Sequence, residues 1–474
     1  MKTQCTPELL PFEAPIRREV LAQFDGGAIS SDGGGLLLGQ VERATGIVRQ
    51  FAACFTDHRD PDLIEHPLEQ LLAQRVYGLA LGYEDLNDHE ELRYDPLLAT
   101  LVGKADPSGQ DRLRARDRGK ALAGKSTLNR LELTPAGADR NSRYKKITAH
   151  SHAIEDLFVE LFLQAYERPP EQIVLDLDAT DNPLHGEQLG RFFHGYYQSY
   201  CYLPLYIFCG EHLLCAKLRP ADIDASAGSV KQLDRIVSRI RRSWPQVRII
   251  IRGDSGFCRE SIMSWCEHNG VDYILGLATN ARLKREVTGA LEQAKRQFEQ
   301  TGQASRVFVE FSYQTRDSWS RARRVVAKAE YLAKGENPRF TTTSIAAEEL
   351  VAAVLYEQHY CARGDMENRI KEQQLYMFAR RTSCATMRAN QLRLWFSAIA
   401  YTLLAALRRL GLKDTELVHA QCDTIRLKLL KIGALVRVTV RKVWISLSES
   451  FPYRHLFVRV YRNLVNTASF PLRC

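Results

Sequence analysis

An alternation of apolar segments and helical segments between residues 171 and 277 constrains the fold most. EQIVLDLDATD, VRIIIRGDSGF and VDYILGLA each have the apolar run of a buried strand, and helical patterns at 226–243 and 259–270 separate them. Parallel strands need such crossover helices, so the pattern predicts an α/β sheet with parallel pairs. Two aromatic, β-rich segments, 192–210 and 211–222, come between the first strand and the first helix. They predict an antiparallel hairpin with Gly210 at the turn.

The flanking segments have other patterns. Residues 66–102 place apolar side chains at three- and four-residue spacing, and 149–166 and 387–411 also predict helices. Residues 351–364 predict a strand and turn, 366–381 predict a helix, and Ser226 is the expected cap of the helix at 226–243. We therefore expect five parts: a mainly helical region at 1–165, an α/β core at 166–304, a β-rich insertion at 305–345, a second part of the core at 346–412, and a basic C-terminal region at 413–474.

The charge balance favours a polyanionic partner without requiring one. The chain has 65 Lys and Arg against 56 Asp and Glu, a formal net charge of +9. Arginines cluster at 112–120, 239–242 and 316–324, and their planar, fork-shaped donors suit phosphate groups. One such cluster is more often a solvated face, whereas several together favour nucleic acid. The candidate contacts in these basic segments are Arg112, Arg114, Lys125, Arg316 and Arg321.

Several classes of protein are disfavoured. The apolar run at 395–407 contains polar residues and is too short to cross a bilayer, so we expect a buried helix and no membrane contact. The N-terminus lacks the apolar core of a signal peptide, so a cytoplasmic location is expected. The eleven cysteines form no C-x-x-C pair, which favours reduced, buried thiols. Neither a dinucleotide-binding G-x-G-x-x-G nor a zinc-binding H-E-x-x-H motif is present.

Acidic residues follow two of the predicted strands. Asp176 and Asp178 occupy alternate positions after an apolar run, so they point to the same face, and Asp181 lies nearby. Asp254 comes directly after a run of β-branched residues, at the end of a strand where open α/β sheets place their ligands. Each of these acids has the alternative role of capping a turn or a helix.

A third acid lies on a predicted helix. Arg363, Glu367 and Lys371 are spaced i, i+4 and i+8 and would share one face. This spacing has two interpretations. It is typical of a ladder of salt bridges, and it also suits a metal-binding glutamate between two cations that bind phosphate. Phosphodiester cleavage commonly uses two divalent ions, and Mg²⁺ or Mn²⁺ prefers carboxylate oxygens. The three acidic segments together therefore indicate a candidate metal site.

LDLDATD, RGDSGF and the pattern Y-x-x-R-x-x-x-E resemble the three acidic motifs of the DDE transposases of bacterial insertion sequences. The chain most resembles the family numbered thirteen-eighty, within the group that has the Y-R-E-K signature. The likeness extends to FDGGAISSDGGGLLL, LAQRVYGLALGYEDLNDH, GKSTLNRLEL, RFFHGYYQSYCYLPLYIFCG, MENRIKEQQL and TIRLKLLKIGALVRV. It covers nearly the whole chain.

The resemblance implies an RNase H-like catalytic domain with a β-rich insertion between the second and third acids. The family's first acid corresponds to Asp178, with Asp176 as the alternative, its second acid to Asp254 and its third to Glu367. These three acids together would bind two Mg²⁺ or Mn²⁺ ions. Its Tyr and Arg correspond to Tyr360 and Arg363.

Two further positions follow from the resemblance. The signature lysine should lie seven residues after the glutamate, where this chain has Gln374, and Lys371 is the nearest substitute. Some relatives use an aromatic residue in the insertion to stabilise a flipped base, for which Trp319 is the candidate. Core packing or cation–π stacking is the alternative role of that ring.

The implied function is metal-dependent cleavage of double-stranded DNA at the ends of an insertion sequence, followed by strand transfer into target DNA. The N-terminal region and the basic segment at 112–130 would recognise the terminal inverted repeats, and two protomers would assemble on the paired ends. The alternatives are a metal-dependent nuclease without strand transfer and a catalytically inactive DNA-binding relic.

Overall fold

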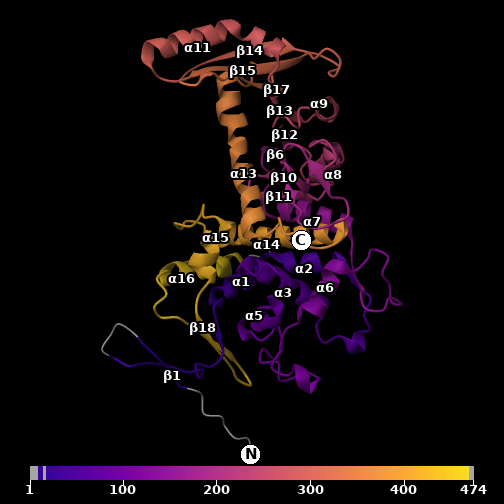
Figure 1. Ribbon diagram of the computed structural model, residues 1–474, viewed down its shortest axis with the longest axis vertical. Coiled ribbons are helices and arrows are strands. Elements are labelled where there is room, and N and C mark those ends of the chain that lie inside the picture. The colour runs from indigo at the N-terminus through magenta and orange to yellow at the C-terminus, as the bar shows by residue number, and fades with distance from the viewer. Residues whose placement is uncertain (1–8, 14–17, 469–474) are drawn as a thin grey trace, which may run out of the picture. The chain divides into compact units, whose positions relative to one another are not determined.

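The computed structural model describes residues 9–13 and 18–468 of the chain (Figure 1). It divides into two compact units, of which one comprises His150–Ala398 and the other comprises Met1–Ala149 together with Ile399–Cys474. Each unit has its own sheets and helices and is described separately.

A nine-stranded mixed sheet forms the centre of unit His150–Ala398, with strand order β11-β10-β6-β12-β13-β17-β15-β14 and β16 beside β15. The strands are β6 (Gln172–Ala179), β10 (Leu205–Cys209), β11 (His212–Lys217), β12 (Arg248–Gly253), β13 (Asp272–Leu277), β14 (Ser305–Tyr313), β15 (Arg323–Leu332), β16 (Gly335–Glu336) and β17 (Arg339–Thr343). β6, β12 and β13 are parallel, and the β10–β11 hairpin turns at Gly210 with φ +58°. The parallel pairs and the hairpin predicted from the sequence are confirmed.

The two faces of this sheet have different covers. Along β12, Ile249 and Ile251 pack into a core with residues of α7 (Ser151–Gln164), α8 (Ser229–Ser243) and α9 (Glu260–His268). Ile250 points the other way and packs with Leu355 and Tyr356. Because successive strand residues alternate between faces, an all-apolar strand such as RIIIRG can fill both cores.

A helical segment spanning 352–376 covers the second face. It consists of α12 (Ala352–Val354), a π-helix (Leu355–Tyr360), a 3-10 turn (Cys361–Arg363), α13 (Gly364–Lys371) and a second π-helix (Glu372–Tyr376). It appears in Figure 1 as the long orange helix beside the strands. The strand and turn predicted for 351–364 are therefore wrong. β-Branched and aromatic residues imitate a strand there, but packing against the sheet overrides that weak preference.

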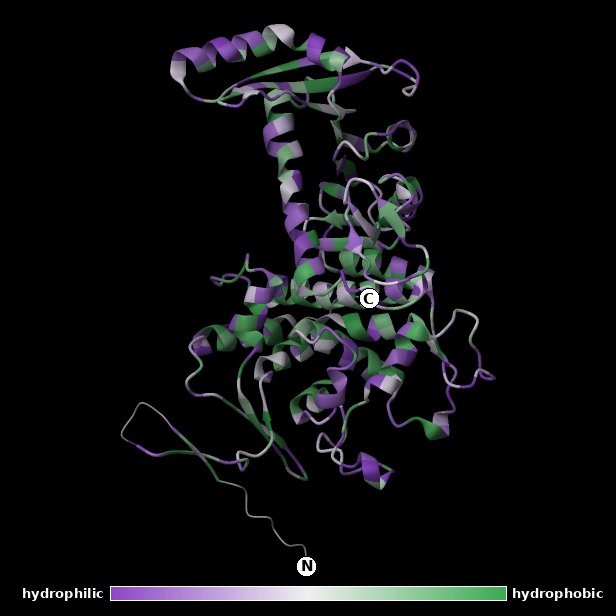
Figure 2. Ribbon diagram, viewed as in Figure 1, coloured by the Kyte–Doolittle hydropathy of each residue, from purple (hydrophilic) through white to green (hydrophobic). Residues whose placement is uncertain are grey.

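The β-rich stretch at 305–345 extends the main sheet, because β17 pairs with β13 and β15 pairs with β17. α11 (Thr288–Thr301) follows α10 (Ala281–Glu286) and packs against β14 and β15. Figure 2 shows α11 as largely hydrophilic, and its buried positions are Leu291 and Ala294. α11 therefore covers the strands with a narrow apolar stripe. The predicted cap of α8 is wrong, since α8 begins after Gly228 rather than Ser226.

The other unit is mainly helical, and α7, which lies within the expected region 1–165, belongs instead to unit His150–Ala398. Its helices include α1 (Leu36–Thr45), α2 (Ile47–Ala52), α3 (Leu68–Leu81), α4 (His89–Leu92), α5 (Pro96–Leu101), α6 (Lys125–Leu133), α15 (Cys422–Ile425) and α16 (Arg454–Ala468). The long helix predicted at 387–411 is confirmed as α14 (Met387–Gly411), whose residues belong partly to each unit. The tail, which could not be assigned from sequence, contains both helix and the strand pair β18 (Ala434–Val438) and β19 (Val443–Leu447).

The glycine-rich segment near the N-terminus packs against this tail. β3 (Ile29–Ser30) pairs with β18, and the Gly33 amide donates to the Ile432 carbonyl at 2.8 Å. A Cβ atom at Gly34 would overlap the carbonyl oxygen of Leu429, so that position requires glycine. The buried carboxylate of Asp32 accepts hydrogen bonds at 2.6 Å from both the Lys431 ammonium and the Tyr83 hydroxyl. Two sequence motifs about 400 positions apart thus form one packed element.

No helix in the described part of the chain is long and apolar enough to cross a membrane. None of the nine described cysteines forms a disulfide, and all except Cys361 are buried, whereas Cys5 and Cys474 lie outside the described residues. The burial agrees with the expectation from sequence.

Candidate functional site

The first two predicted acids lie at the carboxyl ends of adjacent strands. Asp178 is the penultimate residue of β6, and Asp254 directly follows the last residue of β12. Because β6 and β12 are parallel, these ends meet at the same edge of the sheet. Asp254 also shapes its turn, since its Oδ1 accepts a 2.8 Å hydrogen bond from the Gly256 amide.

The third acid reaches the same place from α13. Asp178, Asp254 and Glu367 line one cavity of about 580 Å³. The rest of its lining comes from α13, from the turn after β12 and from an aromatic hairpin, and includes Arg363, Lys371, Gln374, Ser255, His194, Tyr196 and Tyr197. Residues almost 200 positions apart are thus brought together by the sheet and the helix that covers it.

Arg363 lies between two of these acids. Its guanidinium is 2.9 Å from Glu367 Oε1 and 3.8 Å from Asp178 Oδ2. Burial, together with the charges of Asp254 and Glu367, raises the pKa of Asp178 to about 7, although Arg363 acts in the opposite direction. The single arginine therefore does not offset both the burial of this carboxyl and its acidic neighbours.

The donor set fits hard divalent ions in its chemistry. The three acids offer only carboxylate oxygens, which suit Mg²⁺ or Mn²⁺, and their mutual repulsion is what a bound cation relieves. Among the residues that the structure describes, however, no three His, Cys, Asp or Glu side chains lie close enough together to hold one ion. The acids face a common cavity, and Glu367 is turned toward Arg363.

Asp176, the alternative first acid, has a different environment. It lies on the same face of β6 as Asp178 but is only 4% exposed and is not among the residues that line the cavity. Arg252 is its direct neighbour on β12, and the Arg252 Nη2 donates to Asp176 Oδ2 at 2.8 Å. Arg252 also donates to the carbonyl of His359, so this ion pair joins two strands to the helical segment 352–376. The geometry favours Asp178 as the cavity acid.

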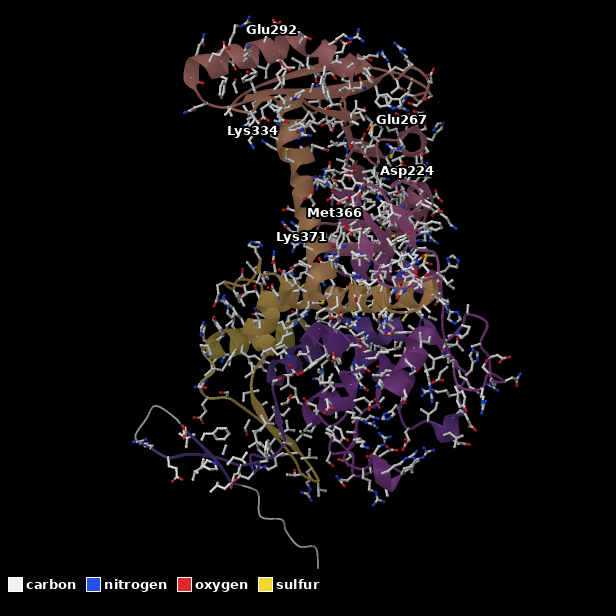
Figure 3. The ribbon with its side chains drawn as sticks, in the orientation of Figure 1. Asp224, Glu267, Glu292, Lys334, Met366 and Lys371 are labelled. Atoms are coloured by element: carbon white, nitrogen blue, oxygen red, sulfur yellow. The ribbon has the colours of Figure 1, made fainter. Side chains whose placement is uncertain are left out.

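Tyr360 lies close enough to Asp254 to interact with its charge. Gln374 and Lys371, the two positions considered for the signature lysine, line the cavity. A Cβ atom at Gly276 of β13 would collide with the Tyr360 hydroxyl, so the ring depends on a glycine there. Gln374 Nε2 donates to the carbonyl of Asp181 at 3.0 Å and so ties the helical segment to the loop after β6. Lys371 lines the cavity, and Figure 3 labels it on the same helical segment as the buried Met366.

The predicted DNA contacts near β14 and β15 are not among the lining residues. Trp319 is 6% exposed and packs edge-to-face on Tyr313, with the Arg323 guanidinium 5.5 Å from its ring centre. The Trp319 ring therefore has the alternative roles of core packing and cation–π stacking rather than an open face for a base. A base would reach the ring only if the side chain left the core. Arg321 forms a 3.0 Å ion pair with Glu267, and Arg316 is exposed.

Three further candidates lie in the mainly helical unit. Arg112 is held by Glu65 at 2.9 Å and by the carbonyl of Lys120 at 2.7 Å, so much of its donor capacity serves the fold. Arg114 is exposed, and Lys125 donates to Asn87 at 3.0 Å. Arg112 and Lys125 therefore take part in local hydrogen bonds, whereas the Arg114 side chain is exposed.

Sequence reasoning assigned no site role to the aromatic hairpin beside the acids. β8 (Phe192–His194) and β9 (Ser199–Tyr202) pair, β7 (Asn182–Pro183) pairs with β9, and the connecting turn carries Tyr196 and Tyr197. The signal was present as a density of aromatic residues in FFHGYYQSYCY. The same residues also have high strand propensity, which is the structural role that the sequence pattern indicates.

A family model described as "Transposase DDE domain group 1" matches residues 12–469. No curated protein matches the sequence.

Proposed function

From the premise that this chain belongs to the transposase DDE domain family, group 1, we propose that it cuts DNA at the ends of an insertion sequence and joins them to target DNA. Membership of the family implies an enzyme of DNA transposition.

One observation carries this proposal: Asp178, Asp254 and Glu367 line one cavity together with Arg363 and Lys371. Acids alone would repel a phosphodiester, and cations alone would bind it without activating it. Their combination supports a site where metal-bound carboxylates and phosphate-binding cations act on the same group.

Transposases of this kind generally use divalent metal ions, and Asp178, Asp254 and Glu367 are the residues that would hold two Mg²⁺ or Mn²⁺ ions here. Such ions, when bound, activate water and stabilise the leaving oxygen of a phosphodiester. For Glu367 to contribute, its carboxylate has to exchange the 2.9 Å contact with Arg363 for a position nearer the two aspartates.

The chain's own cations then have distinct roles. Arg363, released from Glu367, would bind a non-bridging phosphate oxygen, since its planar fork matches that geometry. Lys371 would take the place of the signature lysine as a point charge at the phosphate, because Gln374 carries no charge and is bonded to the loop after β6. Tyr360 would fix the position of Arg363 from the preceding turn.

We also infer a narrower family and an RNase H-like catalytic core for this chain. The parallel strands β6 and β12 with acids at their carboxyl ends, beside an antiparallel hairpin, are compatible with an RNase H-like core. Tyr360, Arg363 and Glu367 on one helical segment support the Y-R-E-K group and the insertion-sequence family numbered thirteen-eighty. Residues 1–165 would recognise the terminal inverted repeats, and two protomers would bind the paired ends.

The test uses a plasmid that carries the protein's own gene with its flanking chromosomal DNA, because the ends of an insertion sequence flank its transposase gene. We expect Mg²⁺- or Mn²⁺-dependent cuts at two positions outside the gene, abolished in Asp254→Asn and Glu367→Gln. Asp365→Asn is the matched control, since Asp365 is an exposed acid of α13 that is not among the lining residues. Metal-dependent cutting retained by Asp254→Asn would overturn the assignment.

A second assay separates the transposase from the alternatives. DNA fragments with pre-cut ends and a free 3′-hydroxyl are incubated with supercoiled target plasmid, and joined products are sequenced across the junction. A nuclease without strand transfer cuts the first plasmid but gives no junctions here. An inactive relic binds DNA and does neither.

A further inference from the structure

The aromatic hairpin, defined as residues 191–202, exposes an unusual number of rings for a stretch of that length. The exposed fractions are 41% for Phe192, 54% for Phe193, 84% for Tyr196 and 48% for Tyr200. A buried position would be the usual place for rings of this size, and exposed clusters of them mark binding surfaces.

The hairpin is held firmly at its base. Tyr202 is fully buried and its hydroxyl donates to the Leu189 carbonyl at 2.6 Å, while the Tyr197 hydroxyl donates to the Ala179 carbonyl at 3.3 Å. Ala179 directly follows Asp178, so this contact joins the hairpin to the strand that bears the first acid. The exposed rings are therefore presented from a rigid support.

The rings contact one another edge-to-face, and their exposure differs from ring to ring. Tyr196 lies edge-to-face on Tyr197 with centroids 5.0 Å apart, and Phe193 lies edge-to-face on Tyr200 at 5.6 Å. The Arg191 guanidinium sits 4.8 Å from the Tyr200 centroid. Tyr196 has the most open ring of this set, and it is also among the residues that line the cavity of the acids.

The neighbourhood combines two chemistries. Arg363 and Lys371 suit a phosphate, and His194, Tyr196 and Tyr197, which line the same cavity, offer ring surfaces. A nucleotide of an unpaired strand has both parts, a phosphate and a base with two open faces. A paired base offers no such face, because its neighbours in the stack cover it.

We propose that the aromatic hairpin stacks an unpaired base adjacent to the phosphodiester in the cavity, with Tyr196 as the stacking ring. The protein accordingly prefers DNA with unpaired nucleotides at the cleavage position over fully paired duplex. This inference rests on the proposed function for the identity of the substrate as DNA.

The composition of the surface favours a base over a protein partner. Rings, hydroxyl groups and the cation Arg191 are the partners that nucleic-acid bases and phosphates use, and the positive groups complement a phosphodiester chain. Protein interfaces also use exposed rings, but Tyr196 lines the same cavity as Arg363 and Lys371, which suits a base whose phosphate lies in that cavity.

Binding is measured with two fluorescent probes in Ca²⁺, which we use in place of the reactive ion. One probe is a duplex with a single-stranded thymidine tail, and the other is the same duplex fully paired. We expect the protein to bind the tailed probe more tightly, and Tyr196→Ala to weaken that binding roughly 5- to 150-fold, the range for loss of one stacked base. Binding of the paired probe should change little.

Two variants separate stacking from apolar docking. Tyr196→Phe keeps a ring and should bind the tailed probe as the parent protein does. Tyr196→Leu keeps an apolar side chain of similar reach and should lose the preference. Leu189→Ala, which removes a 66% exposed neighbouring side chain without a ring, is the control and should leave both probes unaffected.

A 2-aminopurine in the tail next to the duplex junction supplies a second readout. Its fluorescence should fall when the parent protein or Tyr196→Phe binds, and stay high with Tyr196→Leu. Equal affinity for the two probes, or a Tyr196→Leu variant that behaves as the parent does, would overturn this inference and leave the cleavage proposal intact. Conversely, cutting retained by Asp254→Asn would overturn the cleavage proposal whatever these probes show.

Discussion

Asp32 in one unit is buried and Asp178 in the other is partly buried, and their surroundings differ. Asp32 accepts hydrogen bonds from Lys431 and Tyr83 at 2.6 Å each. Asp178 has an arginine at 3.8 Å, which is shared with Glu367, and two acidic neighbours that raise its pKa.

The difference separates an acid that holds a fold together from one that is prepared for a ligand. When a buried carboxylate is paired with a cation, removing either partner leaves an uncompensated buried charge and destabilises the folded chain. A carboxylate facing others costs stability until a cation arrives, and such arrangements are concentrated at functional sites. The same contrast occurs over two residues of β6, where Asp176 is paired with Arg252 and Asp178 is not fully paired.

The largest expected effect is on activity. Asp178→Asn removes a metal-binding charge while keeping the size of the side chain, so we expect metal-dependent DNA cleavage to fall at least about a thousandfold. The melting temperature in metal-free buffer should not fall, because a repulsive charge has been removed. Cleavage rates and thermal unfolding are measured on the same preparation. A variant that unfolds more easily than its parent would place Asp178 with the structural acids.

Asp32→Asn should show the opposite behaviour. It leaves the Lys431 ammonium without its carboxylate partner, and we expect a loss of about 3 kcal/mol in the free energy of unfolding, the lower end for a broken buried pair. Lys431 is 29% exposed, which limits the cost. Urea unfolding measures the change. Adding Lys431→Met should recover part of the stability, and an additive double variant would argue that the two residues do not interact.

Asp176→Asn tests which aspartate of β6 is the catalytic one. The variant loses a charge partner of Arg252, and we expect a stability loss of about 1–3 kcal/mol. Cleavage per folded molecule should be retained, because Asp176 does not line the cavity. If instead Asp176→Asn removed cleavage and Asp178→Asn retained it, the two acids would exchange roles.

The smallest effect per step, counted for one pH unit, is a pH dependence of stability in metal-free buffer. The pKa of Asp178 is raised from 3.8 to about 7, so between these values the folded protein binds a proton that the unfolded chain does not. Stability therefore falls as the pH rises through this window, by at most about 1.4 kcal/mol per pH unit. The stability difference between the parent and Asp178→Asn should shrink toward pH 4. Added Mg²⁺ should reverse the trend at neutral pH.

The strands that carry the acids could be predicted because their pattern is local. VRIIIRGD has an uninterrupted β-branched run and then an acid, and only a buried strand with an exposed end suits both parts. The shared face of Asp176 and Asp178 followed from strand geometry alone. Which of the two is paired did not, because it depends on Arg252, which lies 76 positions away and is placed by the register of β6 and β12.

The segment before Glu367 could not be predicted from its own residues. Val351, Val354, Tyr356 and Tyr360 have the preferences of a strand, but the helix they form is stabilised by the sheet beneath it. The role of the C-terminal tail was likewise invisible locally. Its strands β18 and β19 pair with each other, and β18 also pairs with the N-terminal β3, a contact that the tail's own residues do not predict.

The two π-helical turns at Leu355–Tyr360 and Glu372–Tyr376 have a consequence for comparing this chain with others. A π-turn holds an additional residue per revolution, so counting positions no longer measures rotation about the axis. Seven positions beyond Glu367 is two revolutions of an ordinary α-helix, but here the count crosses the second wide turn and ends on Gln374, which bonds to the loop after β6. Alignments through this stretch are better made by turns than by positions.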